Sequence, residues 1–114
     1  MANILMKSTG IGKSIVTGPV AVCVSSEDYL KKIHKGDIVV VPDLEDEYIP
    51  FVTRNAAAII TAEGGLSSAG AIIAVTLKMT VMLGANECVS LLKDGQIITV
   101  DPVSGNIYEG TLEE

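Results

Sequence analysis

Residues 56–84, AAAIITAEGGLSSAGAIIAVTLKMTVMLG, contain the pattern that decides the fold. The apolar run AAAIITA (56–62) predicts a buried strand, SSAGAIIAVTLKM (67–79) a helix, and TVMLG (80–84) a second short strand. Short strands that alternate with helices indicate a partly parallel sheet, so we expect a mixed α/β domain. The helix is apolar almost all round, and we expect it to be buried on more than one side.

The segment before this unit predicts one more helix and one more strand. DIVVV (37–41) is rich in β-branched residues and predicts a buried strand. SEDYLKKIHK (26–35) predicts a short helix that Ser25 or Ser26 caps and that Gly36 ends.

Two further short helices are expected. One lies around 46–54, with Asp43 or Asp46 as its cap and Pro50 tolerated only near its start. The other lies in ANECVSLL (85–92), before a Lys-Asp-Gly turn.

The two ends of the chain are predicted to be β-structure. Residues 3–26 alternate apolar residues with glycines, which predicts an antiparallel meander with bends at Gly10, Gly12 and Gly18. Pro19 is expected to open a strand. Residues 96–110 predict a closing hairpin. The chain has no repeat or linker, so residues 1–114 are expected to form a single domain.

The amino-acid composition argues against two classes of partner, nucleic acids and membranes. Eight Lys and Arg residues against fourteen Asp and Glu give a net charge of −6, and the chain has no Trp and one Phe. A basic stripe and stacking aromatics are therefore missing, and we expect no nucleic-acid partner. No apolar run approaches the ~20 residues that cross a bilayer, so no membrane partner is expected either.

The cysteines and the first residues indicate the compartment. Cys23 and Cys88 lie in apolar runs, with no Cys-x-x-Cys pair and no nearby histidine, which predicts buried reduced thiols. The first ten residues do not have the pattern of a signal peptide. Both observations favour the cytoplasm.

The loop EGGLSSAG (63–70) admits two interpretations. Gly64 and Gly65 allow a tight turn, Ser67 is placed to cap the following helix, and free N–H groups at that helix start would attract an anion. Alternatively the glycines only make the turn and the serine only caps the helix. From the pattern alone, the second interpretation is favoured.

The same loop resembles the phosphohistidine loop of the phosphoenolpyruvate-utilising enzymes, whose pattern is Gly-Gly-x-Thr-Ser-His-Ala-Ala-Ile-Val-Ala-Arg. The family includes pyruvate phosphate dikinase, phosphoenolpyruvate synthase and phosphotransferase enzyme I. Segments along nearly the whole chain are similar in the same order. The positions that fit the pattern are Gly64, Gly65, Ser67, Ser68, Ala71, Ile72, Ile73 and Ala74.

The resemblance implies a swivelling β/β/α domain: a mixed sheet, short flanking helices and a C-terminal hairpin. Two positions depart from the pattern, because Ala69 stands where the phospho-accepting histidine would be and Val75 where the arginine would be. The run from 71 to 101 looks most like the extra C-terminal domain of many bacterial pyruvate kinases. A barrel of the pyruvate kinase type needs ~250 residues. We therefore expect a piece of a longer enzyme or a free-standing relative.

No other residue is predicted to replace the missing nucleophile. Ser67 and Ser68 lack an adjacent base, and His34 is expected at the surface near a helix end. Lys7 and Lys13 are expected to be ordinary solvated lysines.

The acidic residues do not predict a metal site. Their clustering at a helix start is better explained by capping and by the helix dipole, and their spacing forms no metal cage. Glu63 could orient the loop but has no nucleophile to activate. The cluster consists of Asp43, Glu45, Asp46 and Glu47.

Three hypotheses follow, and none requires a cofactor. The first is a non-catalytic accessory domain that docks on the catalytic core of a parent pyruvate kinase or on neighbouring subunits. The second is a module that binds phosphate or phosphoenolpyruvate through Gly64, Gly65, Ser67, Ser68, Ala69 and Gly70. The third is an active phosphotransferase that uses an unsuspected residue.

Overall fold

The structure is a computed structural model that describes residues 3–43, 46–64 and 69–111. The described chain forms a mixed α/β domain with eight strands in the order β1-β8-β7-β3-β4-β5-β6-β2. The strands are β1 (Ile4–Lys7), β2 (Thr9–Ile11), β3 (Val16–Val22), β4 (Ile38–Val41), β5 (Ala58–Thr61), β6 (Thr80–Leu83), β7 (Ile97–Asp101) and β8 (Asn106–Glu109). The helices are α1 (Ser26–Lys31), α2 (Ile49–Asn55), α3 (Ala69–Leu77) and α4 (Cys88–Leu91), with a 3₁₀ turn η1 (Asp46–Tyr48) before α2.

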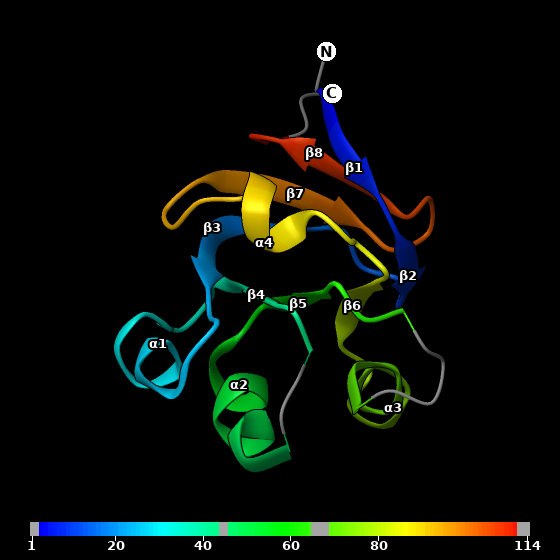
Figure 1. The fold of residues 1–114 in the computed structure, drawn as a ribbon. Coiled ribbons are helices and arrows are strands. Elements are labelled where there is room, and N and C mark those ends of the chain that lie inside the picture. Colours follow the sequence, from blue (N-terminus) through cyan, green and yellow to red (C-terminus); the bar gives the residue numbers. More distant parts are fainter. Residues whose placement is uncertain (1–2, 44–45, 65–68, 112–114) are drawn as a thin grey trace.

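The strands form two layers that share β3. Strands β3, β4, β5 and β6 run parallel to one another, whereas β3, β7, β8 and β1 form antiparallel pairs. The first part of β3 pairs with β7, and its last three residues pair with β4. Helices α1, α2 and α3 lie together below the parallel layer, and β7 and β8 lie above it (Figure 1). The result is the predicted β/β/α arrangement with its C-terminal hairpin.

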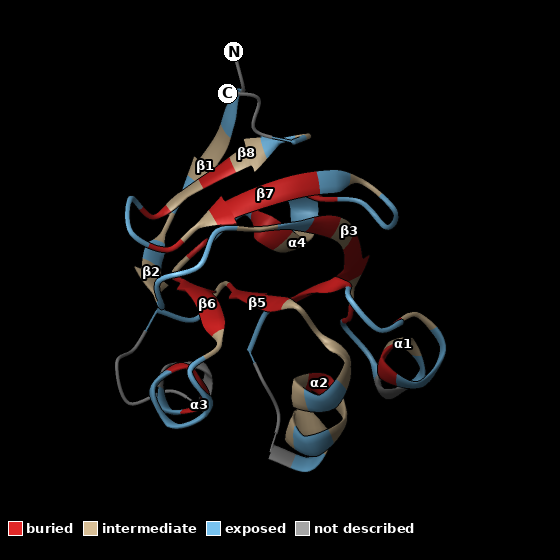
Figure 2. Cartoon of the chain, turned by 180° about the vertical axis from the view of Figure 1, so that it is seen from behind, coloured by how far each residue is buried: buried red, intermediate tan, exposed pale blue. Residues whose placement is uncertain are grey.

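The central strands are apolar because both of their faces are buried. All residues of β4, β5 and β6 are buried, as Figure 2 shows for β5 and β6 in red. Alternate residues of these strands face opposite layers, since successive side chains point to opposite sides of a sheet. One set packs against the helices: Val39, Val41, Ile59, Val81 and Leu83. The other set packs against the antiparallel layer and α4: Ile38, Val40, Ala58, Ile60 and Met82.

The predicted N-terminal meander is wrong. Strand β1 pairs with β8, β2 with β6, and β3 with β7 and β4, so the first three strands find their partners far along the chain. Gly12 makes a bend, with φ at +126°. The prediction that residues 3–26 form strands is correct. The predicted pairing is wrong, because these strands pair with the parallel strands β4 and β6 and with the hairpin strands β7 and β8.

Pro19 lies inside β3 rather than at its start, which corrects the prediction. Val20 donates its backbone N–H to Gln96 O at 2.9 Å, on the β7 side of the strand. The backbone nitrogen of Pro19, one residue earlier, therefore points toward the β4 side. On that side the pairing with β4 begins only at Val20. The N–H group that proline lacks is therefore not needed there.

The helices differ from the predictions mainly at their ends. Ser25 caps α1, as predicted, by accepting the N–H of Asp28 at 3.4 Å. The N-cap of α2 is Tyr48 and it makes no side-chain cap bond, so the prediction of an Asp43 or Asp46 cap is wrong. The chain enters α2 through the 3₁₀ turn, which is a frequent way for an α-helix to begin. Pro50 lies in the first turn, where it is tolerated.

Helix α3 is buried on one side only, which corrects the expectation of burial on several sides. Ile73 and Ala74 face the sheet, whereas Ile72, Val75 and Leu77 are 57%, 70% and 52% exposed. Within the described chain α3 packs on β6 and β2, and its outer side is left apolar and uncovered. Across the same residues, no helix has the length and apolar character that a bilayer crossing demands.

Truncation of a residue between the two layers tests the origin of stability. Ile60 is fully buried there, so Ile60→Ala should lower the free energy of unfolding by about 2–5 kcal/mol in urea titrations. Val75→Ala on the exposed side of α3 is the control, with an expected change within about 0.5 kcal/mol. Equal effects of the two substitutions would contradict this account of the core.

Candidate functional site

The loop singled out by the sequence starts at the carboxyl ends of three parallel strands. After β5 the backbone stays tied to both neighbours. The Ala62 and Glu63 N–H groups donate to Val41 O and Pro42 O at 3.2 and 3.0 Å, and the Gly84 N–H donates to Glu63 O at 3.1 Å. In parallel α/β sheets, this edge is where ligands commonly bind.

Two glycines allow the chain segments at this edge to approach closely. A Cβ atom built on Gly64 would lie 3.2 Å from the Cα of Gly84, which is tighter than ordinary van der Waals contact. Gly84 has φ at +73°, a conformation that side chains with a Cβ rarely adopt. Thr61 adds a hydrogen bond from its hydroxyl to Glu63 O at 2.7 Å. The start of the loop is therefore held by backbone that follows β4 and β6 and by the Thr61 side chain of β5.

Helix α3 begins five residues after Gly64. Ala69 and Gly70 form its first two positions, so the residue in the predicted nucleophile position lies at the helix start. Gly65, Ser67 and Ser68 lie outside the described residues, and their predicted roles as turn, cap and anion ligands stay predictions. The backbone N–H groups at such a helix start lack helical partners. They can bind an anion without any covalent step.

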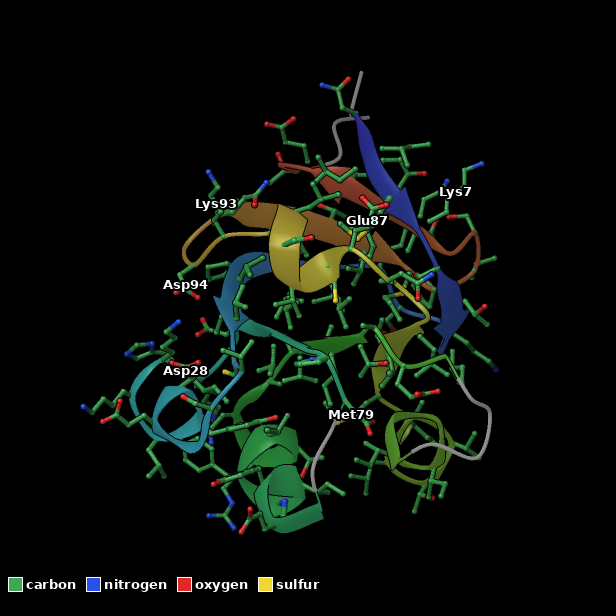
Figure 3. The ribbon with its side chains drawn as sticks, viewed as in Figure 1. Lys7, Asp28, Met79, Glu87, Lys93 and Asp94 are labelled. Carbon is green, nitrogen blue, oxygen red and sulfur yellow. The ribbon has the colours of Figure 1, made fainter. Side chains whose placement is uncertain are left out.

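A cavity of about 280 Å³ lies beside Gly84 and includes residues that sequence reasoning missed. Asn86 and Glu87 line it from the segment after β6, and Lys7 lines it from β1. Figure 3 labels Lys7 and Glu87 on these elements. The sequence offered one indication of their position: the strand predicted over 80–84 ends at Gly84, so the residues after it start at the carboxyl edge of the sheet. Lys7 and Lys13 are both exposed, as predicted.

The only histidine of the chain is not brought to the loop. His34 precedes β4, whereas the loop lies at the carboxyl ends of the strands, and the His34 side chain is 79% exposed. Its Nδ1 lies 3.7 Å from Asp37 Oδ2. The prediction of a surface histidine near a helix end is confirmed.

The acidic residues are placed as follows. Asp43 follows β4 and is exposed, and Glu47 is exposed in η1. Glu45 lies outside the described residues, as does the side chain of Asp46. In the part of the chain that the structure describes, no group of three His, Cys, Asp or Glu residues could hold a metal ion.

Both cysteines are buried thiols, as predicted. Burial, with a further contribution from Asp28, raises the pKa of Cys23 to about 12, and burial raises the pKa of Cys88 to about 11. Their Sγ atoms donate weakly to Ala21 O and Val41 O. A thiol with such a pKa is protonated near neutral pH and is a poor nucleophile.

Comparison with known proteins places these features in context. The family model described as "PEP-utilising enzyme, mobile domain" matches residues 33–105. A probable phosphoenolpyruvate synthase of Archaeoglobus fulgidus is 37% identical over 112 residues, which is 98% of this chain and 15% of that protein. A pyruvate kinase of Geobacillus stearothermophilus is 36% identical over 110 residues, which is 96% of this chain and 19% of that enzyme. The chain thus spans less than a fifth of these two curated relatives.

The fold is also found among solved structures. An Enzyme I protein solved in solution by NMR superposes with a TM-score of 0.61 and has 24% sequence identity. The match covers 74% of this chain and 34% of that one. At this identity the likeness shows the fold alone.

Substitution of Gly64 tests the close approach beneath the loop. A Cβ at this position would lie 3.2 Å from the Cα of Gly84, so Gly64→Ala should lower the free energy of unfolding by about 1–3 kcal/mol. Gly84→Ala and Gly95→Ala are the controls for backbone conformation. Their φ angles are +73° and +82° and neither new Cβ would meet a tight contact, so each should cost about 1–2 kcal/mol. An unchanged urea midpoint for Gly64→Ala would show that the approach of Gly64 to Gly84 does not constrain the loop.

The thiols give a test that depends on pH. In native protein at pH 8, Cys23 and Cys88 should resist a disulfide reagent, and they should react quickly in urea. Their folded pKa values exceed the ordinary value of 9.0, so the folded state holds the protons longer. The stability contributed by the protonated thiols should therefore fall as pH rises from about 9 through 11–12. Cys88→Ala should show a smaller fall, and rapid labelling of native protein would contradict the prediction.

Proposed function

Because the chain belongs to the family of PEP-utilising enzyme mobile domains, we propose that it serves a pyruvate kinase as a non-catalytic accessory domain. The parent reaction is phosphoryl transfer from phosphoenolpyruvate to ADP in the cytoplasm. The observation that carries the proposal is Ala69, which takes the place of the phospho-accepting histidine in the resemblance. A methyl group has no lone pair with which to attack phosphorus.

The choice of parent rests on this alanine, since sequence identity does not separate the candidates. The pyruvate kinase and the phosphoenolpyruvate synthase quoted above are 36% and 37% identical to the chain. We expect a pyruvate kinase core to transfer the phosphoryl group without this domain, so a domain that lacks the nucleophile is compatible with it. We expect a phosphoenolpyruvate synthase to need this domain as the carrier of the phosphoryl group, so the same domain would not be compatible with it.

The outer side of α3 supports a docking role. Ile72, Val75 and Leu77 expose apolar surface on this helix. The sequence from 64 to 86 contains no acidic residue, although the whole chain has a net charge of −6. An apolar and nearly uncharged patch on an acidic domain is the kind of surface that a protein partner covers. The partner we propose is the catalytic core of the parent kinase or a neighbouring subunit.

Labelled phosphoenolpyruvate tests the non-catalytic part of the proposal. After incubation with the labelled compound, the isolated domain should carry no label above the background of an unrelated protein. Ala69→His should fit the helix start, and we expect no turnover by the isolated domain, since the domains that deliver the phosphoryl group are not part of this chain. Stoichiometric labelling of the native chain would instead support an active phosphotransferase that uses another residue.

The second candidate function is anion binding without transfer. The helix start at Ala69 and Gly70 and the two glycines before it would hold phosphate or phosphoenolpyruvate by backbone N–H groups, together with Ser67 and Ser68. Millimolar phosphoenolpyruvate should then shift the amide NMR signals of residues 64–70 in a saturable way. Equal concentrations of sodium chloride are the control. Unchanged signals at these amides would rule out this candidate.

A further inference from the structure

Two stretches of the chain without acidic residues lie side by side in the fold. The chain has fourteen Asp and Glu residues, yet none of them falls in residues 1–26 or in residues 64–86. Strand β2, from the first stretch, is paired with β6, from the second. Helix α3 packs on both strands and lies below them in Figure 1 and in Figure 2. One side of an acidic domain is therefore built from segments that carry no acidic residue.

The turn that follows β2 meets the segment that follows α3. Thr80 Oγ1, at the start of β6, donates to Ser14 O at 2.8 Å. A Cβ atom built on Gly12 would lie only 3.2 Å from Met79 O, so the two backbones approach closely. The turn of residues 12–15 and the end of α3 therefore share one part of the surface.

The exposed side chains where this turn meets the helix end are apolar or basic. Ile15 is 54% exposed in the turn, and Leu77 is 52% exposed at the end of α3. Lys13 and Lys78 are exposed as well. Within the described residues no carboxylate forms an ion pair with either of these lysines, whereas Lys32 pairs with two. We call Lys13, Ile15, Leu77 and Lys78 the junction surface.

Lys78 has a backbone conformation that suits glycine better than lysine. Its φ is +57°, and among the described residues it is the one with a positive φ that is not glycine. The position directly after a helix often takes this conformation and is then usually glycine, because a Cβ atom is unfavourable there. The chain has a lysine at this position instead, and thereby places a positive charge at the end of the exposed side of α3.

We propose that the docking surface extends from the outer side of α3 over the junction surface, where Lys13 and Lys78 pair with carboxylates of the parent kinase core. The proposal rests on the proposed function and adds the chemistry of the partner, which is an apolar area bordered by Asp or Glu side chains. Charge complementarity supports this choice, because lysines beside an apolar patch attract an acidic surface and disfavour a basic one. All fourteen acidic residues lie in the other segments of the chain, so the rest of the domain would repel the same acidic surface.

Affinity for the catalytic core of the pyruvate kinase from the source organism tests the pairing, with sedimentation velocity at low and at high salt as the readout. Lys13→Gln and Lys78→Gln should each weaken the complex about threefold at low salt and make the affinity less dependent on salt. Lys93→Gln is the matched control, because it changes the net charge equally and should leave the affinity unchanged. Lys93 is exposed, and Figure 3 shows it well apart from Met79.

Two further measurements separate binding from folding. A positive charge at a helix C-terminus is favourable in itself, so Lys78 could serve the helix alone. Lys78→Gly suits the positive φ and should not lower the urea midpoint, yet it should weaken the complex as Lys78→Gln does. In the unaltered chain, acetic anhydride should modify Lys13 and Lys78 severalfold more slowly in the complex than in the free chain, and Lys93 at the same rate in both.

The possible outcomes distinguish this proposal from the proposed function. If the wild-type chain does not bind the core, the docking role itself is contradicted. If the wild type binds and both Lys13→Gln and Lys78→Gln bind as Lys93→Gln does, only the pairing at the junction surface is wrong. If the chain alone forms a dimer that Lys78→Gln weakens, the surface is a contact between two copies, and the proposal is wrong.

Discussion

Burial of the parallel strands on both faces is the constraint on which the rest of the structure depends. Strands β4, β5 and β6 need one layer over each face, and the chain supplies helices on one side and the β7–β8 layer on the other. Because the three strands are parallel, their carboxyl ends meet at one edge. The loop after β5 and the segment after β6 are therefore brought together by the core itself, whatever residue stands at position 69.

The core does not depend on position 69, so the fold can keep its shape whether or not that position carries a nucleophile. The backbone bonds of Glu63 to Pro42 and Gly84, and the approach of Gly64 to Gly84, fix the start of the loop without any side chain from α3. A histidine at a helix start contributes reactivity and little packing. If alanine replaces such a histidine, as we propose, the nucleophile is lost, whereas the core still holds Gly64 and the helix start.

Local pattern was sufficient for the elements that lie in the core. The runs DIVVV, AAAIITA and TVMLG predicted β4, β5 and β6, and the turn residues after Val100 predicted the hairpin. Pairing of the first three strands could not be predicted, because their partners are distant and composition does not specify them. The position of Pro19 inside β3 and the exposed apolar side of α3 could not be predicted for the same reason. Each depends on which elements of the folded chain pack beside it. In the predicted loop, Gly64 and the start of α3 follow β5 as the pattern indicated, whereas the approach of Asn86 and Glu87 to this edge depends on tertiary contacts.

The central claim is that α3 docks the domain on a kinase core, and sedimentation velocity tests it most directly. The chain would be mixed with the catalytic core of the pyruvate kinase from its source organism, with Val75→Glu on the exposed side of α3 as the variant and Glu109→Gln on β8 as the control. The account predicts a complex with the wild type and the control, and a complex at least about tenfold weaker with Val75→Glu. A failure of the wild-type chain to bind, or equal binding by Val75→Glu, would contradict it.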